Sequence, residues 1–201
     1  MTTANDLFLI AIAAERPVGQ GDLSLALAGA ELIDLLGVGA AAVHDDHIEP
    51  GESPSPEDPL LAEAAGALVR EAPFEPVEDW LWRRGESLSA RYQAALETNG
   101  ALTRKRGGRL SLGAERMEPS DPAAPRRATD RASTQPALAA LASVVGADSG
   151  RAAAETDPDE GPVATVVAVV DDAVRELEAV RQRRSLEKAA FANVWRGPGG
   201  D

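Results

Sequence analysis

Residues 23–36 constrain the fold more than any other segment, because they predict a helix that is apolar on nearly every side. Asp22 precedes them in the position of a helix N-cap, and Gly37 or Gly39 ends them. Their charged residues are Glu31 and Asp34, which mark the polar side. One stripe at helical spacing consists of Leu25, Ala28, Gly29, Leu32, Ile33 and Leu36. A helix of this kind belongs in a core, where Gly29 permits the close approach of another helix.

The side chains that are available for a core also favour helices. The chain has 201 residues, of which 44% are hydrophobic but only 3% are aromatic, so Ala, Leu and Val must do most of the packing. We therefore expect a mainly α fold class. The chain is predicted to form a single globular helical domain over residues 1–201, with short β-hairpins, a flexible loop at 146–162 and a disordered tail at 196–201.

A basic hairpin is predicted after a helix that ends at Asn99-Gly100. Residues 101–103 and 109–112 have the composition of strands, and residues 104–108 form the turn between them, with two glycines and three consecutive cations. Residues 101–131 hold 8 basic and 4 acidic side chains, a net charge of +4, although the whole chain carries −13. Such a patch suits an anionic surface, such as a membrane leaflet, a phosphorylated headgroup or an acidic partner. The alternative is a solvated basic turn.

The other segments give coarser expectations. Residues 2–14 read as a buried strand or a first helix, and Asp58-Pro59 begins a helix that extends to about residue 72. Residues 77–84 form a short helix with Trp80 and Trp82, which are two residues apart and cannot both face a core. Residues 120–132 read as a poorly helical connector and 135–145 as a helix. Residues 163–195 are helical, buried in the first half and amphipathic in the second, and Ser185 is in position to begin a separate last helix.

No motif indicates catalysis. The chain has no cysteine, and it lacks the phosphate-binding patterns GxxxxGK[ST] and GxGxxG and the nucleophile elbow GxSxG. His44 and His47, with Asp45 and Asp46 between them, have the side chains of a divalent metal site, but they lie in a polar turn without an identifiable third ligand. We interpret them as a solvated turn. We therefore expect no enzyme activity, no cofactor and no metal.

Composition also limits the location and the partners. The longest apolar runs, 7–14 and 163–170, are eight residues each, against the roughly 20 that a membrane-spanning helix needs. We expect a cytoplasmic protein. The net charge of −13 argues against nucleic acid as a partner.

Several blocks of the chain, in order, resemble the Golgi phosphoprotein 3 family in the shorter, alanine-rich form found in bacteria. LFLIAIAAERPVG followed by LALAGAELIDLLGVGAAAV is similar to the family's opening, and DPLLAEAAGALV to its next helix. VEDWLWRRGESLSARYQAALETNGALTRKRGGRLSLG resembles the most recognisable block of the family, a Trp-containing helix, a helix with arginine and the hairpin. The resemblance covers residues 7–121, and residues 135–195 follow the family more loosely.

This resemblance implies a mostly helical domain with a protruding hairpin. It also implies a peripheral membrane protein that recognises phosphatidylinositol 4-phosphate, with the hairpin aiding membrane contact or self-association. In eukaryotic members an aromatic side chain and three arginines form the headgroup pocket. The matching positions here fall near Gly19, Ala28, Glu86 and Ser89, with Arg91 two residues further on. These four positions lack the aromatic and cationic side chains of that pocket, and the cations of Arg91 and the hairpin would still attract anionic lipid without a specific headgroup pocket.

Two functions follow from the sequence. The first is a non-catalytic, peripheral membrane protein, at the inner membrane face, that binds phosphoinositide (phosphatidylinositol 4-phosphate) or other anionic lipid headgroups. Its expected anion-binding side chains are Arg91, Arg104, Lys105, Arg106 and Arg109, and its expected membrane-contact side chains are Leu110 and Leu112. The second is a soluble protein-interaction or scaffold protein that keeps the fold and has lost lipid binding. In that case the amphipathic segment 171–195 serves a protein partner or self-association.

Overall fold

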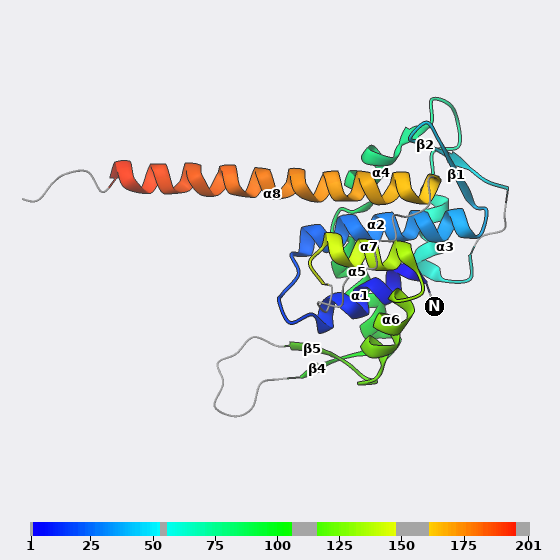
Figure 1. Ribbon diagram of the computed structural model, residues 1–201, viewed down its shortest axis with the longest axis horizontal. Helices are drawn as coiled ribbons and strands as arrows, with labels where there is room; N and C mark the ends of the chain where they lie inside the picture. Colours follow the sequence, from blue (N-terminus) through cyan, green and yellow to red (C-terminus); the bar gives the residue numbers. More distant parts are fainter. Residues whose placement is uncertain (1, 53–55, 106–115, 148–160, 196–201) are drawn as a thin grey trace, which may run out of the picture.

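The computed structural model describes residues 2–52, 56–105, 116–147 and 161–195 (Figure 1). These residues form eight helices and five short strands. The helices are α1 (Thr3–Ala13), α2 (Gln20–Gly37), α3 (Pro59–Gly66), α4 (Val77–Arg84), α5 (Leu88–Thr98), α6 (Ala124–Ala132), α7 (Pro136–Val144) and α8 (Pro162–Trp195). The strands are β1 (Ala41–His44), β2 (His47–Pro50), β3 (Glu75–Pro76), β4 (Leu102–Lys105) and β5 (Arg116–Pro119). The mainly α fold class is confirmed. Most of the predicted loop, 148–160, and the tail, 196–201, lie outside the described residues.

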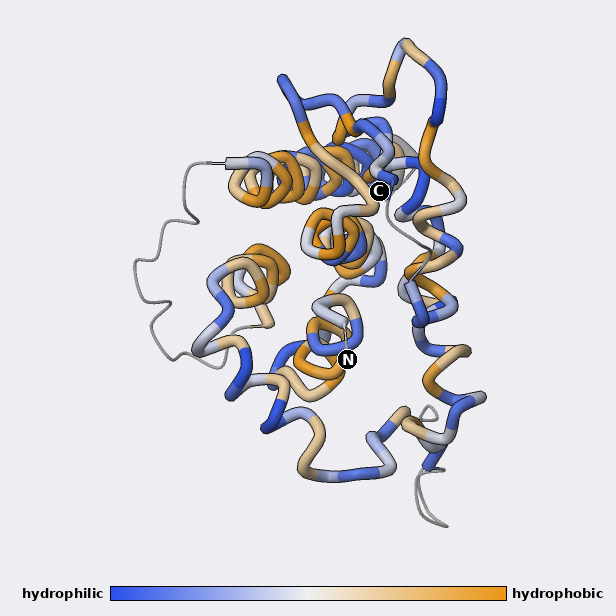
Figure 2. Tube along the Cα trace, turned by 90° about the vertical axis from the view of Figure 1, so that its right-hand side faces the viewer, coloured by the Kyte–Doolittle hydropathy of each residue, from blue (hydrophilic) through white to orange (hydrophobic). Residues whose placement is uncertain are grey.

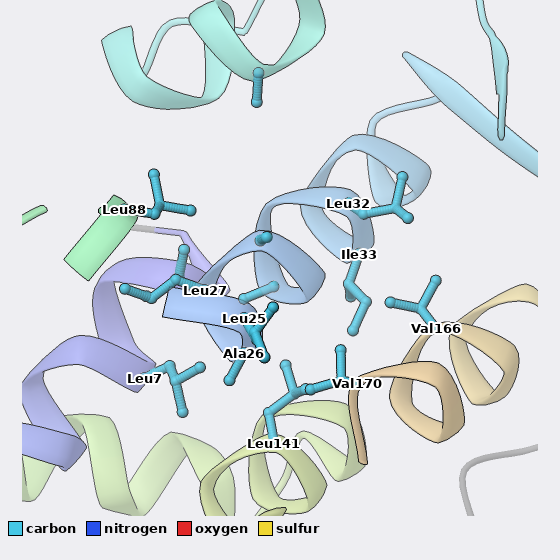
Figure 3. Close-up of a cluster of buried hydrophobic side chains, with 14 of the residues drawn as sticks. Leu7, Leu25, Ala26, Leu27, Leu32, Ile33, Leu88, Leu141, Val166 and Val170 are labelled. Carbon is cyan, nitrogen blue, oxygen red and sulfur yellow. The ribbon is translucent and has the colours of Figure 1, made fainter. Parts of the chain in front are cut away.

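Helix α2 is the centre of the fold, as its sequence predicts. It packs against α1, α3, α4, α5, α7 and α8, and its side chains form much of the buried apolar cluster in Figure 3. Gly29 permits the close approach of α8, because a Cβ atom at that position would lie 2.4 Å from Val170 Cγ2. Figure 2 shows apolar segments gathered in the centre of the molecule and polar segments mainly at its edge. The predicted start of α2 is wrong by a few residues, since Gly19 and not Asp22 is the N-cap.

Two small antiparallel sheets lie at the edge of the helical body. The first has the order β1–β2–β3, and its hairpin pairs His44 with His47. Asp45 and Asp46 form the two-residue turn with φ values of 46° and 66°, the conformation that a two-residue hairpin of this kind requires. The second sheet is the β4–β5 hairpin, which lies at the lower edge of the body in Figure 1.

The second hairpin differs from the sequence-based prediction. Leu102 pairs with Pro119 and Lys105 pairs with Arg116, so the second strand is β5 and not residues 109–112. Arg104 and Lys105, which were expected in the turn, belong to strand β4. The segment 106–115, which contains the rest of the predicted turn, lies outside the described residues.

Three further segments are settled by the structure. Residues 2–14 contain helix α1 and no strand. The prediction of a poorly helical connector at 120–132 is wrong, since this segment contains helix α6, which buries Ala128. Helix α8 is continuous through Ser185, so the predicted break there is wrong. It runs along the helical body, and its C-terminal part extends well beyond the body (Figure 1). The predicted cap of α3 is confirmed, because the Asp58 side chain accepts hydrogen bonds from the backbone N–H groups of Leu60 and Leu61. The predicted end near residue 72 is wrong, since α3 ends at Gly66.

Candidate functional site

The cations of strand β4 are exposed, and each faces a carboxylate of this chain. The Arg104 side chain is 57% exposed, and its Nη2 lies 3.2 Å from Glu97 Oε2 at the end of α5. The Lys105 side chain is 69% exposed and forms an ion pair with Glu118 on strand β5. Hydrogen bonds from Gln93 and the charge of Arg104 lower the pKa of Glu97 below its ordinary value. The two cations are therefore accessible to an external anion, which would compete with Glu97 and Glu118.

The other predicted hairpin residues cannot be placed. Arg106, Arg109, Leu110 and Leu112 all lie outside the described residues. Strand β4 ends just before the segment 106–115 and strand β5 begins just after it, and the two strands pair antiparallel. The predicted roles of these four side chains stay predictions.

Arg91 does not share a site with the β4 cations. Its guanidinium forms an ion pair with Glu63 of α3. Arg104 instead pairs with Glu97, which lies six residues after Arg91 on α5. Six residues turn an α-helix by about 240°, so Arg91 and Glu97 leave the helix on different sides. The structure thus pairs Arg91 with Glu63 and not with a residue of the hairpin, in an ion pair whose two side chains are 37% and 51% exposed.

This ion pair belongs to a network centred on Glu31, whose position sequence reasoning missed. Glu31 was expected on the polar side of its helix, but its side chain is fully buried and accepts hydrogen bonds from Arg84 Nε at 2.7 Å and Nη2 at 2.9 Å. The Tyr92 hydroxyl donates to the same carboxylate at 3.0 Å. On its other side Arg84 Nη1 reaches Glu63 Oε1 at 3.0 Å, which links the network to Arg91.

The network is structural in character. Burial raises the pKa of the Glu31 carboxyl above its ordinary value, and the hydrogen bonds and charge of Arg84 oppose that rise. Burial, followed by the Glu31 charge, raises the pKa of Tyr92, so its hydroxyl stays a neutral donor. Glu31, Arg84 and Tyr92 are not among the residues that line the hollow described next. Their contacts join α2, α4 and α5.

A hollow of about 450 Å³ lies where the N-terminal ends of α2 and α5 meet. Its lining includes Gln20, Ser24, Trp82, Glu86, Ser89 and Leu177. The two helix ends are joined by their serines: the Ser24 hydroxyl accepts from the Ser89 backbone N–H at 3.0 Å and donates to the Ser89 hydroxyl at 2.9 Å. Ser87, before the first residue of α5, has a φ of 56° and no side-chain capping bond.

The hollow brings together positions that the sequence resemblance singled out. Glu86 and Ser89 line it, and Gly19, the N-cap of α2, directly precedes the lining residue Gln20. Ala28 is fully buried elsewhere, and its carbonyl accepts from Trp80 Nε1 at 3.2 Å. Glu86 contributes a negative charge to the hollow, and none of the residues that line it is a cation.

Helix α8 supplies a cation at the rim that sequence reasoning missed. Arg181 Nη1 lies 2.7 and 2.8 Å from the two carboxylate oxygens of Asp22. Gly21 makes room for this contact, because a Cβ atom there would lie 2.9 Å from Arg181 Nη2 and 2.8 Å from Leu177 Cδ2. Asp22 and Arg181 are 159 residues apart, so no local pattern signals their pairing. The ion pair leaves the rim close to neutral.

The histidine turn is a solvated hairpin turn in the structure. His47 Nδ1 lies 3.0 Å from the Asp45 carbonyl and 2.8 Å from Asp46 Oδ1, and the hydrogen bond with the carbonyl raises the pKa of His47. Across the residues that the structure describes, no group of three or more His, Asp or Glu side chains is arranged to hold a metal ion. None of the described helices is long and apolar enough to cross a membrane.

The protein is thus a mainly helical one, with a β-hairpin at the edge of the helical body and a hollow between the N-terminal ends of two helices. Comparison with family models assigns the chain more narrowly. It belongs to the Golgi phosphoprotein 3 (GPP34) family, whose model matches residues 4–192. Comparison with curated proteins gave no match.

Proposed function

We propose that this protein is a peripheral, non-catalytic member of its family that binds anionic lipid surfaces through the β4–β5 hairpin. The observation that supports the proposal most directly is the charge of residues 101–131, +4 in a chain of −13. Two of these cations, Arg104 and Lys105, project from the edge of the body with exposed side chains. Lipid attraction near the surface contributes about 1 kcal/mol per cation, so a small basic cluster gives weak, salt-dependent binding.

The hollow at the helix ends supports charge-based rather than headgroup-specific binding. Its lining contains Glu86, and Arg181 at its rim is paired with Asp22. A specific phosphate site would instead need several cations or donors directed at one anion. The proposed ligand is therefore an anionic membrane at the cytoplasmic face, with phosphatidylinositol 4-phosphate as one of several acceptable headgroups.

Vesicle flotation at low salt tests the lipid proposal. The full chain is expected to float with phosphatidylcholine vesicles that contain phosphatidylglycerol or phosphatidylinositol 4-phosphate, and not with phosphatidylcholine alone. At equal surface charge the two anionic lipids are expected to bind it about equally. Binding that is no stronger on anionic than on neutral vesicles would overturn the proposal, and a clear preference for one headgroup would overturn its non-specific form.

The first mutational prediction concerns the described cations. R104A/K105A is expected to weaken binding to anionic vesicles by about 30-fold at low salt, since two cations contribute about 2 kcal/mol of attraction. The matched control R16A/R70A removes the same charge from exposed arginines on other segments and should leave binding within a few-fold of wild type. Equal losses in the two variants would show that net charge, and not the hairpin, drives binding.

The second mutational prediction concerns the carboxylates that face these cations. E97Q/E118Q removes the partners of Arg104 and Lys105 and should strengthen binding to anionic vesicles several-fold. The gain arises because the lipid no longer competes with an intramolecular carboxylate. D45N/D46N neutralises two exposed carboxylates in the other hairpin and serves as the control. Titration of vesicles by fluorescence or flotation measures the change, and an unchanged affinity in E97Q/E118Q would contradict hairpin contact.

A further inference from the structure

The C-terminal part of α8 stands apart from the rest of the protein. Arg181 forms an ion pair with Asp22 of the body, and the residues that follow it, 182–189, are all exposed. We call residues 182–195 the arm, which is about 21 Å long at 1.5 Å per residue. Leu186 and Phe191 in the arm are 72% and 69% exposed, more than any other large apolar side chain in the described part of the chain. Figure 1 shows the arm extending beyond the body.

A helix end of this length has little stability by itself. Isolated helices of fewer than about 12–15 residues are marginal in water, because most helical stability comes from packing. The arm also places apolar side chains in solvent. Both features indicate a surface that is covered by a partner.

The charges of α8 indicate what kind of partner fits. Residues 171–178, the acidic block, hold four carboxylates and one cation, a net charge of −3. Residues 181–188, the basic block, hold four cations and one carboxylate, a net charge of +3. The two blocks follow each other along one straight helix and are equal in length and opposite in charge.

Both blocks are accessible. In the acidic block Asp172, Glu176 and Glu178 are exposed, and in the basic block Arg183, Arg184 and Lys188 are exposed. These three cations have no ion pair with another described residue, although most cations of the body face a carboxylate. Three exposed positive charges on the arm of an acidic protein are poised for a negative surface.

An antiparallel second copy of α8 provides that surface. When two such helices lie side by side about a two-fold axis, the basic block of each faces the acidic block of the other, and the contact is the same on both copies. Parallel pairing would place like charges together. The antiparallel arrangement also brings each arm beside the N-terminal part of the partner helix, near the hollow where Trp82 is 38% exposed. Leu186 and Phe191 thereby gain an apolar surface.

We propose that the protein forms an antiparallel homodimer in which each α8 arm packs against the acidic block of the other copy. The contact strip is about 10 Å wide, because it is the width of one helix. The area that it buries is therefore small compared with the roughly 1,200–2,000 Å² of a standard stable interface. The dimer is therefore concentration-dependent and sensitive to salt. The inference does not depend on lipid binding.

Charge reversal of each block, followed by mixing, tests the dimer. The acidic-block variant D172K/E176K/E178K and the basic-block variant R183E/R184E/K188E each make α8 uniform in charge. Arg181 is kept because it holds α8 to the body. Sedimentation or light scattering over micromolar to millimolar concentrations at low salt should show the full chain moving from 20.9 kDa toward twice that mass. Each variant alone should raise the dissociation constant at least about tenfold, and an equimolar mixture should restore the dimer.

The control R16E/R70E/R126E has the same net charge as the basic-block variant, with its changes at exposed arginines outside α8, and should dimerise like wild type. Circular dichroism checks that every variant keeps its helices. A monomeric wild type at all concentrations would overturn the proposal, as would a single variant that dimerises as tightly as wild type, or a mixture that fails to restore the dimer. A wild type that stays monomeric while its flotation on anionic vesicles depends on the basic block would identify the arm as a membrane element, which also overturns the dimer.

Discussion

Replacing Arg84 by methionine is expected to lower the free energy of unfolding by about 3–5 kcal/mol, the cost of leaving a buried charge without its partner. Arg84 donates two hydrogen bonds to Glu31, and the side chains of the two residues are 4% and 0% exposed. In the variant, Glu31 keeps the Tyr92 hydroxyl as a donor but loses its counter-charge. Urea unfolding of the full chain, followed by circular dichroism, measures the loss.

The destabilisation of R84M should depend on pH. Burial already raises the pKa of Glu31, and removal of Arg84 removes the main opposing interaction, so the folded-state pKa rises further. For a group whose folded pKa exceeds its unfolded value, the favourable contribution is present at low pH and is lost as pH rises through the folded pKa. R84M should therefore be closer to wild type at pH 5 than at pH 8.

The double variant E31L/R84M separates the buried charge from the packing. Replacing both members of a buried ion pair by apolar side chains is often neutral or stabilising, so the double variant should recover much of the loss and should lose the added pH dependence. Recovery identifies the uncompensated carboxylate as the cause. If R84M and E31L/R84M were equally unstable at every pH, the cost would lie in the contacts of Arg84 with Glu63 and the Leu60 carbonyl.

The sequence predicts the central helix well because the signal is local. The spacing of its apolar residues and the glycine at position 29 are sufficient to expect a core helix that another helix approaches closely. The burial of Glu31 is not local. Its partner Arg84 is 53 residues away in the sequence. Without knowledge of that partner, a single carboxylate on an apolar helix indicates a solvent-exposed side of the helix. The same limit hides the Arg181–Asp22 pair at the rim of the hollow.

The hairpin shows a different limit. The cations and glycines of residues 104–108 predict a hairpin turn, but the strand register depends on pairing that residues 101–119 specify only weakly, since polar and apolar residues do not alternate clearly there. Leu102 is buried and fixes the first strand against the body, and Lys105 then pairs with Arg116. Arg104 and Lys105 are confirmed as exposed cations of the hairpin, whereas Arg91 belongs to the Glu63 network.

Replacing Trp80 by alanine is expected to lower the free energy of unfolding by about 3–5 kcal/mol, the range for truncating a large buried aromatic side chain. The spacing of Trp80 and Trp82 predicts that only one of the two side chains faces the core. The structure shows that it is Trp80, which is fully buried, whereas Trp82 is 38% exposed. The Trp80 indole also donates to the Ala28 carbonyl at 3.2 Å, which ties α4 to the central helix. Urea or thermal unfolding measures the loss.

W82A is the matched control, because it removes the same side chain two residues away on the same helix. Its cost should stay below about 1 kcal/mol, since an exposed side chain leaves no cavity in the core. W80F should fall between the two, because it keeps part of the apolar volume and loses the hydrogen bond to the Ala28 carbonyl. Equal losses in W80A and W82A would contradict the packing of α4 against α2, because that packing leaves only one of the two indoles in the core.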